Sequence, residues 1–432
     1  MTESAQSQSS KRRALQVAQS RPPTSHVAIA VCSLLLILVT AAVPAAANEV
    51  AECTAHASSA ASEQMDDFDA LQDRLSQELV DWVRSTEGGY INDKVQLRKG
   101  NDDGSPRGLY ATDTIEAGEI ICTIPWSIIA KPYPEDDERD MCSTMKWLYN
   151  DMKEERTPHG RYLKSMPRNF LPDWWTDSGR ELLQKLVGKR LPPQGVWHYY
   201  WTKNYAGEAE DCDGGHMHDE LWSHAVAMVS GRGDDHLLVP FYDMINHRNG
   251  HYYNTRHDVS KGEFHQLVAH RRIDAGEQLY SSYNQCNVCG GRHDEYGTPE
   301  MFEEYGFVES LPQRWYVHQV RLKFDLVESD DGKGEPQVAF IVPPSVWGVT
   351  FMQEEVRRLE KFGKDYRDDK DLAANIPPLE LEMIWQYHDA TLTAFNAAIL
   401  AAEGKIDEVV WHCDCDWYLV RDWEEEGCTF ED

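Results

Sequence analysis

The strongest constraint on the fold is that two stretches typical of short strands and turns are separated by about ninety residues typical of helices. Residues 95–130 and 236–283 carry short apolar runs, which are broken by turn signals such as Ala275-Gly276. Residues 141–230 show helical spacing and are cut by prolines. A β-rich unit tolerates an insert of this size when the two ends of the insert lie close together. The pattern predicts an α+β fold, in which a helical insert interrupts a β-rich domain.

The regions on either side of this domain are predicted to be largely helical. Residues 68–83 have apolar residues at helical spacing, and two later stretches, 346–362 and 379–403, follow a strand-like segment that starts near 312. We favour core packing for the apolar residues of the last helix. The predicted domains are a signal peptide or signal anchor (1–48), a linker and N-terminal helix (49–91), a β-rich domain (92–310) with its insert at about 136–230, and a C-terminal domain (311–432).

The N-terminus has the features of a targeting segment. Residues 27–43 are apolar and uncharged, basic residues precede them, and the small-residue stretch PAAANE follows. This order fits a secretory signal peptide. An uncleaved signal anchor is the close alternative, and the long region before the apolar run favours it. Both readings predict a lumenal body in the secretory pathway or endomembrane system. The chain has no Asn-x-Ser/Thr site, so glycosylation gives no support.

The charge balance restricts the partners of the chain. Its 42 basic and 73 acidic residues give a net charge of −31, which repels nucleic acid and anionic lipid. An acidic surface attracts a basic partner such as a lysine-rich protein segment, although solubility alone would also explain the charge. The hydrophobic content of 41% is enough for a packed core.

Three short segments with candidate chemistry lie in the strand-like stretches before and after the insert. The first is RGLYAT, where Gly108 would let the backbone approach a ligand closely; a glycine that ends a turn is the simpler alternative. The second is LVPFYDMINH, where an apolar run leads into Asp243, Asn246 and His247. An asparagine amide can grip both an ammonium and a carboxylate group, but it can equally cap a turn. A metal site here is discounted, because no second His or Cys stands at ligand spacing.

The third segment is IDAGEQLYSSYN, which has the YGF segment downstream. Two tyrosine hydroxyls, those of Tyr280 and Tyr283, flank a pair of serines. Each aromatic side chain taken alone is explained as well by core packing.

Together, these segments resemble the SET-domain protein methyltransferases, and specifically the branch with a helical insert that includes the Rubisco large-subunit lysine methyltransferase and the actin-histidine methyltransferase. The GLYA, DMINH, AGEQLYSSY and YGF segments occur in the order of that family, and YLKSMP, PDWW and LQKLVGKRLP resemble its helical region. The resemblance covers about residues 92–310 and, more weakly, the tail. It implies a β-rich SET fold with a helical insert and a mostly helical C-terminal domain that helps to choose the substrate.

The resemblance also implies how S-adenosylmethionine is held. Backbone around Gly108, Leu109 and Tyr110 would bind its methionine end. Asn246 would bind its amino acid moiety, and His247 would meet its adenine, largely through backbone.

The remaining implied roles concern the reaction. Tyr283 matches the catalytic tyrosine, Tyr305 and Phe307 match an aromatic segment that closes over the cofactor site, and Asp243 matches an acidic residue near the substrate channel. The implied activity is transfer of a methyl group to a protein lysine. Because a free lysine has a pKa near ~10.4, an apolar channel has to favour its neutral form. The alternatives are a protein-histidine methyltransferase and a SET-fold interaction module without turnover.

The sequence departs from this branch in three places. Gly231 separates Ser230 from Arg232, which puts a cofactor contact by Arg232 in doubt, and Asn284 follows Tyr283 where the family has Gly or Asp. The third departure is the unusual spacer QCNVCGGRHDEYGT before the YGF segment.

The cysteines leave three readings open. Many SET enzymes outside this branch build a zinc site from a C-terminal Cys-x-Cys and cysteines near the core. Four thiolates suit tetrahedral zinc, and the candidate ligands are Cys286, Cys289, Cys413 and Cys415. Disulfide bonds in an oxidising lumen explain the same residues equally well, and unpaired thiols are the third reading.

Overall fold

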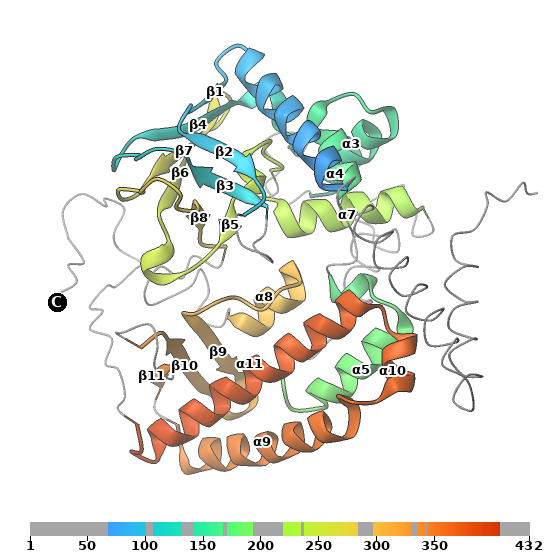
Figure 1. Cartoon of the computed structure of the whole chain (residues 1–432), viewed down its shortest axis with the longest axis vertical. Helices are drawn as coiled ribbons and strands as arrows, with labels where there is room; N and C mark the ends of the chain where they lie inside the picture. Colours follow the sequence, from blue (N-terminus) through green and yellow to red (C-terminus); the bar gives the residue numbers. More distant parts are fainter. Residues whose placement is uncertain are drawn as a thin grey trace, which may run out of the picture. The chain divides into compact units, whose positions relative to one another are not determined.

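A computed structural model (Figure 1) describes residues 68–100, 107–131, 141–166, 171–192, 219–234, 237–283, 297–329, 336–342 and 344–406. From Gln72 onward the chain forms one compact unit. A helix covers residues 68–85, as the apolar spacing predicted. Leu75, Leu79 and Val83 lie on its buried face, one helical turn apart.

The β-rich domain is built from a four-stranded sheet and two strand pairs. The sheet has the order β1-β4-β7-β6 and is antiparallel throughout. The strand pairs are β2-β3, which is antiparallel, and β5-β8, which is parallel. The strand bounds are Tyr90–Ile91 (β1), Val95–Arg98 (β2), Gly108–Ala111 (β3), Ile120–Pro125 (β4), Asn246–His247 (β5), Thr255–Ser260 (β6), Phe264–Ala269 (β7) and Tyr280–Ser281 (β8).

Two glycine turns bring the first and third motif segments together. Gly118 and Gly276 have φ values of 79° and 88°, a left-handed conformation that favours glycine. Ile115 and Ile273 form an antiparallel bridge next to these turns. Residues more than 150 positions apart in sequence are therefore neighbours in space, which is what a β-rich unit completed after an insert requires.

Within the described residues, the expected insert forms four α-helices, and three of them have a side-chain N-cap. The bounds are Met141–Glu154 (α3), Pro158–Ser165 (α4), Asp177–Val187 (α5) and Glu220–Arg232 (α7). Thr157, Thr176 and Asp219 each accept a hydrogen bond from backbone N–H groups in the first turn of α4, α5 and α7. Helix α7 is buried without interruption from Trp222 to Val229, so it is an internal helix and has no solvent face over that stretch.

The C-terminal part combines a small sheet with helices. The sheet order is β11-β10-β9, antiparallel. The bounds are Thr298–Tyr305 (α8), Gln313–Val317 (β9), Leu322–Val327 (β10), Gln337–Val342 (β11), Val346–Tyr366 (α9), Lys370–Asn375 (α10) and Pro378–Ala402 (α11). Short 3₁₀ helices cover Trp126–Ile128, Pro172–Trp174, Tyr242–Met244 (η3), Gly250–Tyr252 and His318–Val320. This arrangement confirms the α+β fold class and the mostly helical C-terminal region.

The insert does not pack as one separate body. Helix α3 contacts α4 and α7, and α7 contacts α8. Helix α5 instead lies beside α11 (Figure 1). Leu182, Leu183 and Leu186 of α5 share one apolar core with Trp315 of β9 and residues of α9 and α11. Helix α5 of the expected insert therefore buries its apolar face against the C-terminal helices.

One buried carboxylate joins α5 to α11. Glu380, which is 2% exposed, accepts hydrogen bonds from the Thr176 backbone N–H at 3.0 Å and from the Thr176 hydroxyl at 2.7 Å. A Cβ at Gly179 would lie 2.1 Å from a Glu380 carboxylate oxygen. The first turn of α5 thus packs closely against the Glu380 side chain of α11.

We predict that Glu380→Ala lowers the free energy of unfolding by about 2 kcal/mol, because it removes two hydrogen bonds to a buried carboxylate. Glu382→Ala is the matched control, since Glu382 is exposed on the same helix. Urea unfolding of both variants measures the difference. Equal losses in the two variants would show that the contact with Thr176 contributes nothing.

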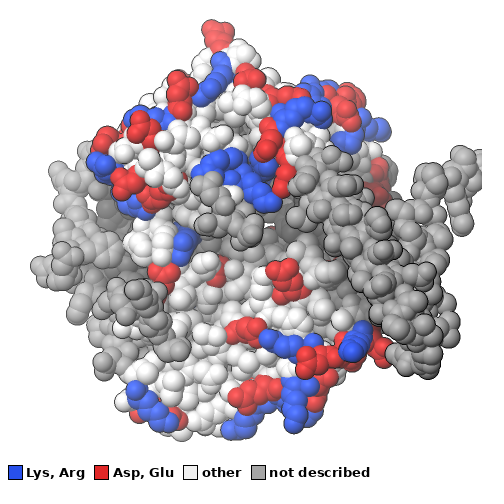
Figure 2. All heavy atoms as spheres, viewed as in Figure 1, with Lys and Arg blue, Asp and Glu red and all other residues white. Residues whose placement is uncertain are grey.

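The described surface carries both signs of charge. On the face shown in Figure 2, acidic and basic side chains are interspersed among uncharged residues. Among the described residues, no helix is long and apolar enough to cross a membrane. The predicted signal peptide or anchor at 1–48 lies outside the described residues.

Candidate active site

The first motif meets the second and third around Gly108. This residue begins β3, in which all four residues are buried. A Cβ at Gly108 would lie 2.5 Å from Asn246 Nδ2 and 2.6 Å from Gln278 Nε2. Asn246 Nδ2 donates a hydrogen bond to Arg107 O at 3.0 Å. A side chain at position 108 would clash with these two amides, so its protein neighbours already require a glycine here.

The other two predicted residues of β3 are held by the third motif. Leu109 is fully buried, and its carbonyl oxygen accepts a hydrogen bond from the backbone N–H of Leu279 at 2.8 Å. The Tyr110 hydroxyl donates to Gln278 Oε1 at 3.0 Å.

Tyr283 is bound at two points to the segment that contains Asn246 and His247. Its backbone N–H donates to His247 Nδ1 at 2.9 Å, and its hydroxyl donates to Ile245 O at 2.5 Å. Strand β5 pairs with β8 just before Tyr283, with Asn246 opposite Tyr280. Residues from the two motif segments are therefore in direct contact.

Burial of the Tyr283 hydroxyl is the main reason that its pKa is raised, to about 12. Nearby charges act in opposite directions, since Arg232 lowers this pKa and Asp243 raises it. The phenol therefore keeps its proton throughout the physiological range. Because that proton is directed to Ile245 O, the oxygen lone pairs remain available to a group entering the site.

An aromatic cluster surrounds Tyr283. Helix α8 ends at Tyr305, and Gly306 at φ 73° turns the chain so that Phe307 follows. The Tyr283 ring centroid lies 4.9 Å from that of Tyr305 and 5.2 Å from that of His247. Phe307 lies 5.9 Å from His247. The YGF segment thus packs against the tyrosine and the histidine of the other two motifs.

Asp243 lies beside this group but is paired with the insert. Its carboxylate is fully buried in η3 and accepts a hydrogen bond from His159 Nε2 of α4 at 2.9 Å. Arg232 donates to the Asp243 backbone oxygen at 2.9 Å. Within the described residues, Asp243 Oδ1 and His159 Nδ1 have no hydrogen-bond partner. His159 was not among the candidates, since a single histidine in a helical stretch carries no sequence signal.

Gln278 is a second residue that sequence reasoning missed. Its Oε1 accepts hydrogen bonds from Tyr110 and Tyr280, at 3.0 and 2.8 Å. Its Nε2 is buried and has no partner in the described part of the chain. The residue lies inside the third motif, two positions before Tyr280, so its place on the strand was the available signal.

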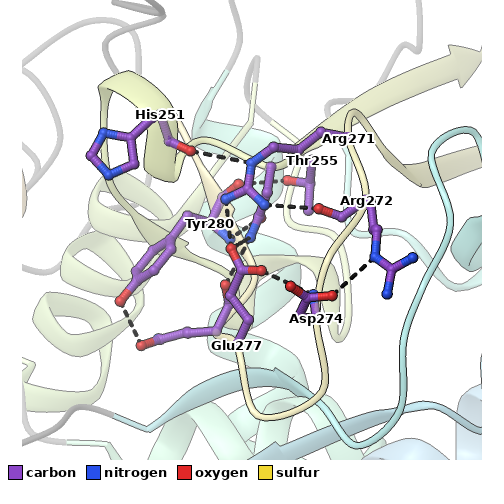
Figure 3. A network of polar contacts seen from close by, with 9 residues as sticks. His251, Thr255, Arg271, Arg272, Asp274, Glu277 and Tyr280 are labelled. Atoms are coloured by element: carbon purple, nitrogen blue, oxygen red, sulfur yellow. Dashed lines mark hydrogen bonds and ion pairs between the residues drawn. The ribbon is translucent and has the colours of Figure 1, made fainter.

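A polar network supports the strand that leads to Tyr283 (Figure 3). Arg271 donates to Glu277 at 2.5 Å and to the His251 carbonyl at 3.2 Å. Thr255 donates to the Tyr280 carbonyl at 2.8 Å. The backbone N–H of Asp274 donates to Glu277 at 3.0 Å. These contacts fix the turn and strand before Tyr283 from the side of β6.

The four cysteines predicted to bind zinc, Cys286, Cys289, Cys413 and Cys415, all lie outside the described residues. Among those that are described, no group of three or more His, Cys, Asp or Glu side chains is placed to hold a metal ion.

Comparison with known proteins agrees with this geometry. Residues 106–284 match the model of the SET domain family. The chain therefore contains a SET domain, and its class is that of the protein methyltransferases, as the motifs indicated.

The solved structures that are similar to the chain include two of LSMT. One is the SET domain of LSMT bound to lysine and AdoHcy, at 13% identity and a TM-score of 0.44, over 77% of this chain and 91% of that one. The other is Rubisco LSMT bound to AdoMet, at 14% identity and a TM-score of 0.44, over 77% and 92%. Among curated proteins, none matches the sequence.

Proposed function

We propose that this protein transfers a methyl group from S-adenosylmethionine to a lysine side chain of another protein. The observation that carries the proposal is the junction of three distant segments. Gly108 lies against Asn246, and Tyr283 is hydrogen-bonded to His247 and to Ile245. The SET domain match over the same residues supports it.

The residues around Gly108 fit the amino acid end of this cofactor. Gln278 Nε2 has no hydrogen-bond partner within the described residues, and Asn246 Nδ2 donates one hydrogen to Arg107 O and keeps a second. An unsatisfied buried N–H is costly, so an acceptor is expected there. A carboxylate supplies such an acceptor. In this proposal Gly108, Leu109 and Tyr110 hold the methionine end, while His247, Tyr305 and Phe307 enclose the other side.

When bound, S-adenosylmethionine supplies a methyl group already activated by the positive charge of its sulfur. Tyr283 would orient the receiving amine through its oxygen lone pairs, and its retained proton prevents it from competing as a nucleophile. The rings of Tyr305 and Phe307 would make the surroundings apolar, which favours an uncharged amine over an ammonium. Positioning of the two reactants would then supply most of the rate.

The acidic balance of the chain supports a basic target segment, since its net charge is −31. Asp243 would lie near the substrate channel in this scheme. The C-terminal domain would help to select the substrate.

Transfer of radiolabel from S-adenosylmethionine to a peptide library, followed by amino acid analysis, tests the proposal. We expect methyl-lysine. Methyl-histidine would retain the enzyme class and change the target residue. Cofactor binding without transfer to any peptide or cell extract protein would favour an interaction module over an enzyme.

The pH dependence provides a second test. Because only the neutral amine reacts, kcat/KM should rise with pH towards about 10, the ordinary range of a lysine. The pKa of Tyr283 is raised to about 12, so its phenol stays protonated and imposes no fall in rate over this range. Initial rates at saturating cofactor measure the profile. A fall above about pH 9 that parallels tyrosinate absorbance would contradict the assignment.

We also propose a lumenal location, in the secretory pathway or anchored to its membrane. The apolar run at 27–43 supports this, and so does Cys142, which is disulfide-bonded.

Metal analysis and thiol alkylation of the purified protein distinguish zinc at Cys286, Cys289, Cys413 and Cys415 from disulfide bonds. Bound zinc with metal-protected thiols would support the first, and thiols that react only after reduction the second.

A further inference from the structure

Glu309 is a buried carboxylate that connects the candidate active site to the C-terminal part of the fold. Its side chain is 1% exposed. One oxygen accepts hydrogen bonds from His247 Nε2 at 2.8 Å and Asn249 Nδ2 at 3.2 Å. The other accepts from the Thr298 hydroxyl of α8 at 2.6 Å and the backbone N–H of Arg314 in β9 at 3.4 Å. All four partners are donors, so both carboxylate oxygens act as acceptors.

The contacts of His247 determine which of its nitrogens carries the proton. Nδ1 faces the backbone N–H of Tyr283 at 2.9 Å, and a backbone N–H can only donate. Nδ1 must therefore be an acceptor without a proton. The proton of the neutral ring then lies on Nε2, which faces Glu309. Glu309 stabilises this tautomer because it offers an acceptor at that position alone.

A second route leads from Glu309 to the same segment. Asn249 donates to Glu309 through Nδ2, and its Oδ1 accepts a hydrogen bond from the Ser282 hydroxyl at 2.9 Å. Asn249 itself is 2% exposed. Ser282 and Tyr283 are thus hydrogen-bonded to Asn249 and His247, respectively. Both of these side chains donate to the Glu309 carboxylate.

We propose that Glu309 is a positioning residue, which fixes the Nε2–H tautomer of His247 and thereby the backbone of Tyr283. The expected effect of Glu309 on the reaction rate rests on the proposed methyl transfer. Its expected effect on the tautomer of His247 does not. Because Thr298 and Arg314 hold the same carboxylate, the placement of Tyr283 also depends on α8 and β9. The C-terminal part therefore contributes to the active site itself as well as to substrate choice.

Glu309→Gln in the full chain tests the proposal. The side-chain amide keeps the shape but adds donors where four donors already converge, so the tautomer of His247 should no longer be fixed. The ¹⁵N spectrum of histidine-labelled protein reports the tautomer, with the His247 signal assigned by its loss in His247→Gln. We expect a pure Nε2–H form in the wild type and a mixture in Glu309→Gln. We also expect a fall in kcat of about tenfold or more, with a smaller change in the KM for cofactor.

Glu360→Gln is the matched control, since Glu360 is exposed on α9; it should alter neither signal nor rate. An Nδ1–H form or an imidazolium in the wild type would overturn the proposal, even if Glu309→Gln fails to fold. An unchanged tautomer and kcat in a folded Glu309→Gln would overturn it as well. If the wild type transfers no methyl group, the spectrum still decides the role of Glu309, so the two failures remain distinguishable.

Discussion

Replacing Tyr283 by phenylalanine is expected to lower kcat at least about a hundredfold while cofactor affinity stays nearly unchanged. The substitution removes one oriented oxygen from the site, a loss that typically costs a factor of about 10²–10³. It keeps the ring contacts with His247 and Tyr305, and it keeps the backbone hydrogen bond to His247 Nδ1. The lost hydrogen bond to Ile245 O should cost only about 1 kcal/mol of stability.

Tyr387→Phe is the matched control for this experiment. Its hydroxyl also donates to a backbone carbonyl, that of Pro192 at 2.6 Å, but it lies in the C-terminal core. This variant should lose stability and keep kcat. Single-turnover rates and calorimetric cofactor binding on both variants separate the two effects. Label transfer that persists at the wild-type rate in Tyr283→Phe would rule out the catalytic assignment.

Replacing Gly108 by alanine is expected to weaken cofactor binding by at least about tenfold. The new methyl group would lie 2.5 Å from Asn246 Nδ2 and 2.6 Å from Gln278 Nε2, well inside contact distance. Neither amide moves easily, because Asn246 is bonded to Arg107 O and Gln278 to the hydroxyls of Tyr110 and Tyr280. Relief of the clash must displace β3 or the two amides, and both are proposed to hold the cofactor.

Gly348→Ala serves as the control for Gly108→Ala. A Cβ at Gly348 in α9 would meet its nearest atoms at 3.6 and 3.7 Å, an ordinary contact. Circular dichroism confirms that both variants fold, and calorimetry compares their affinity for S-adenosylmethionine. Normal affinity in a folded Gly108→Ala would mean that the cofactor does not bind beside this glycine.

The sequence predicted the segments that meet in the site better than the contacts that hold them. Short apolar runs broken by turn signals indicated that residues near Gly108, Asn246 and Tyr283 belong to one β-rich unit, since such patterns reflect local backbone geometry. Apolar periodicity likewise predicted a helix at 346–362, and the structure has one at Val346–Tyr366.

The supporting polar contacts had no such signature. The separation in sequence is 62 positions between His247 and Glu309 and 84 positions between His159 and Asp243. It is 168 positions between Tyr110 and Gln278. A buried polar side chain needs one partner of suitable chemistry, and any distant residue can supply it. Likewise, the amphipathic pattern of α5 specifies an apolar face but not which helices cover it. These parts of the site therefore required the three-dimensional structure.

The shared core of α5 and α11 has a consequence for biosynthesis. Thr176 and Glu380 are 204 positions apart, so the apolar face of α5 emerges from the ribosome long before the helix that shields it. At typical elongation rates of about 5–20 residues per second, this face stays uncovered for roughly ten seconds or more. Fragments that stop before α11 leave this face uncovered and are expected to aggregate.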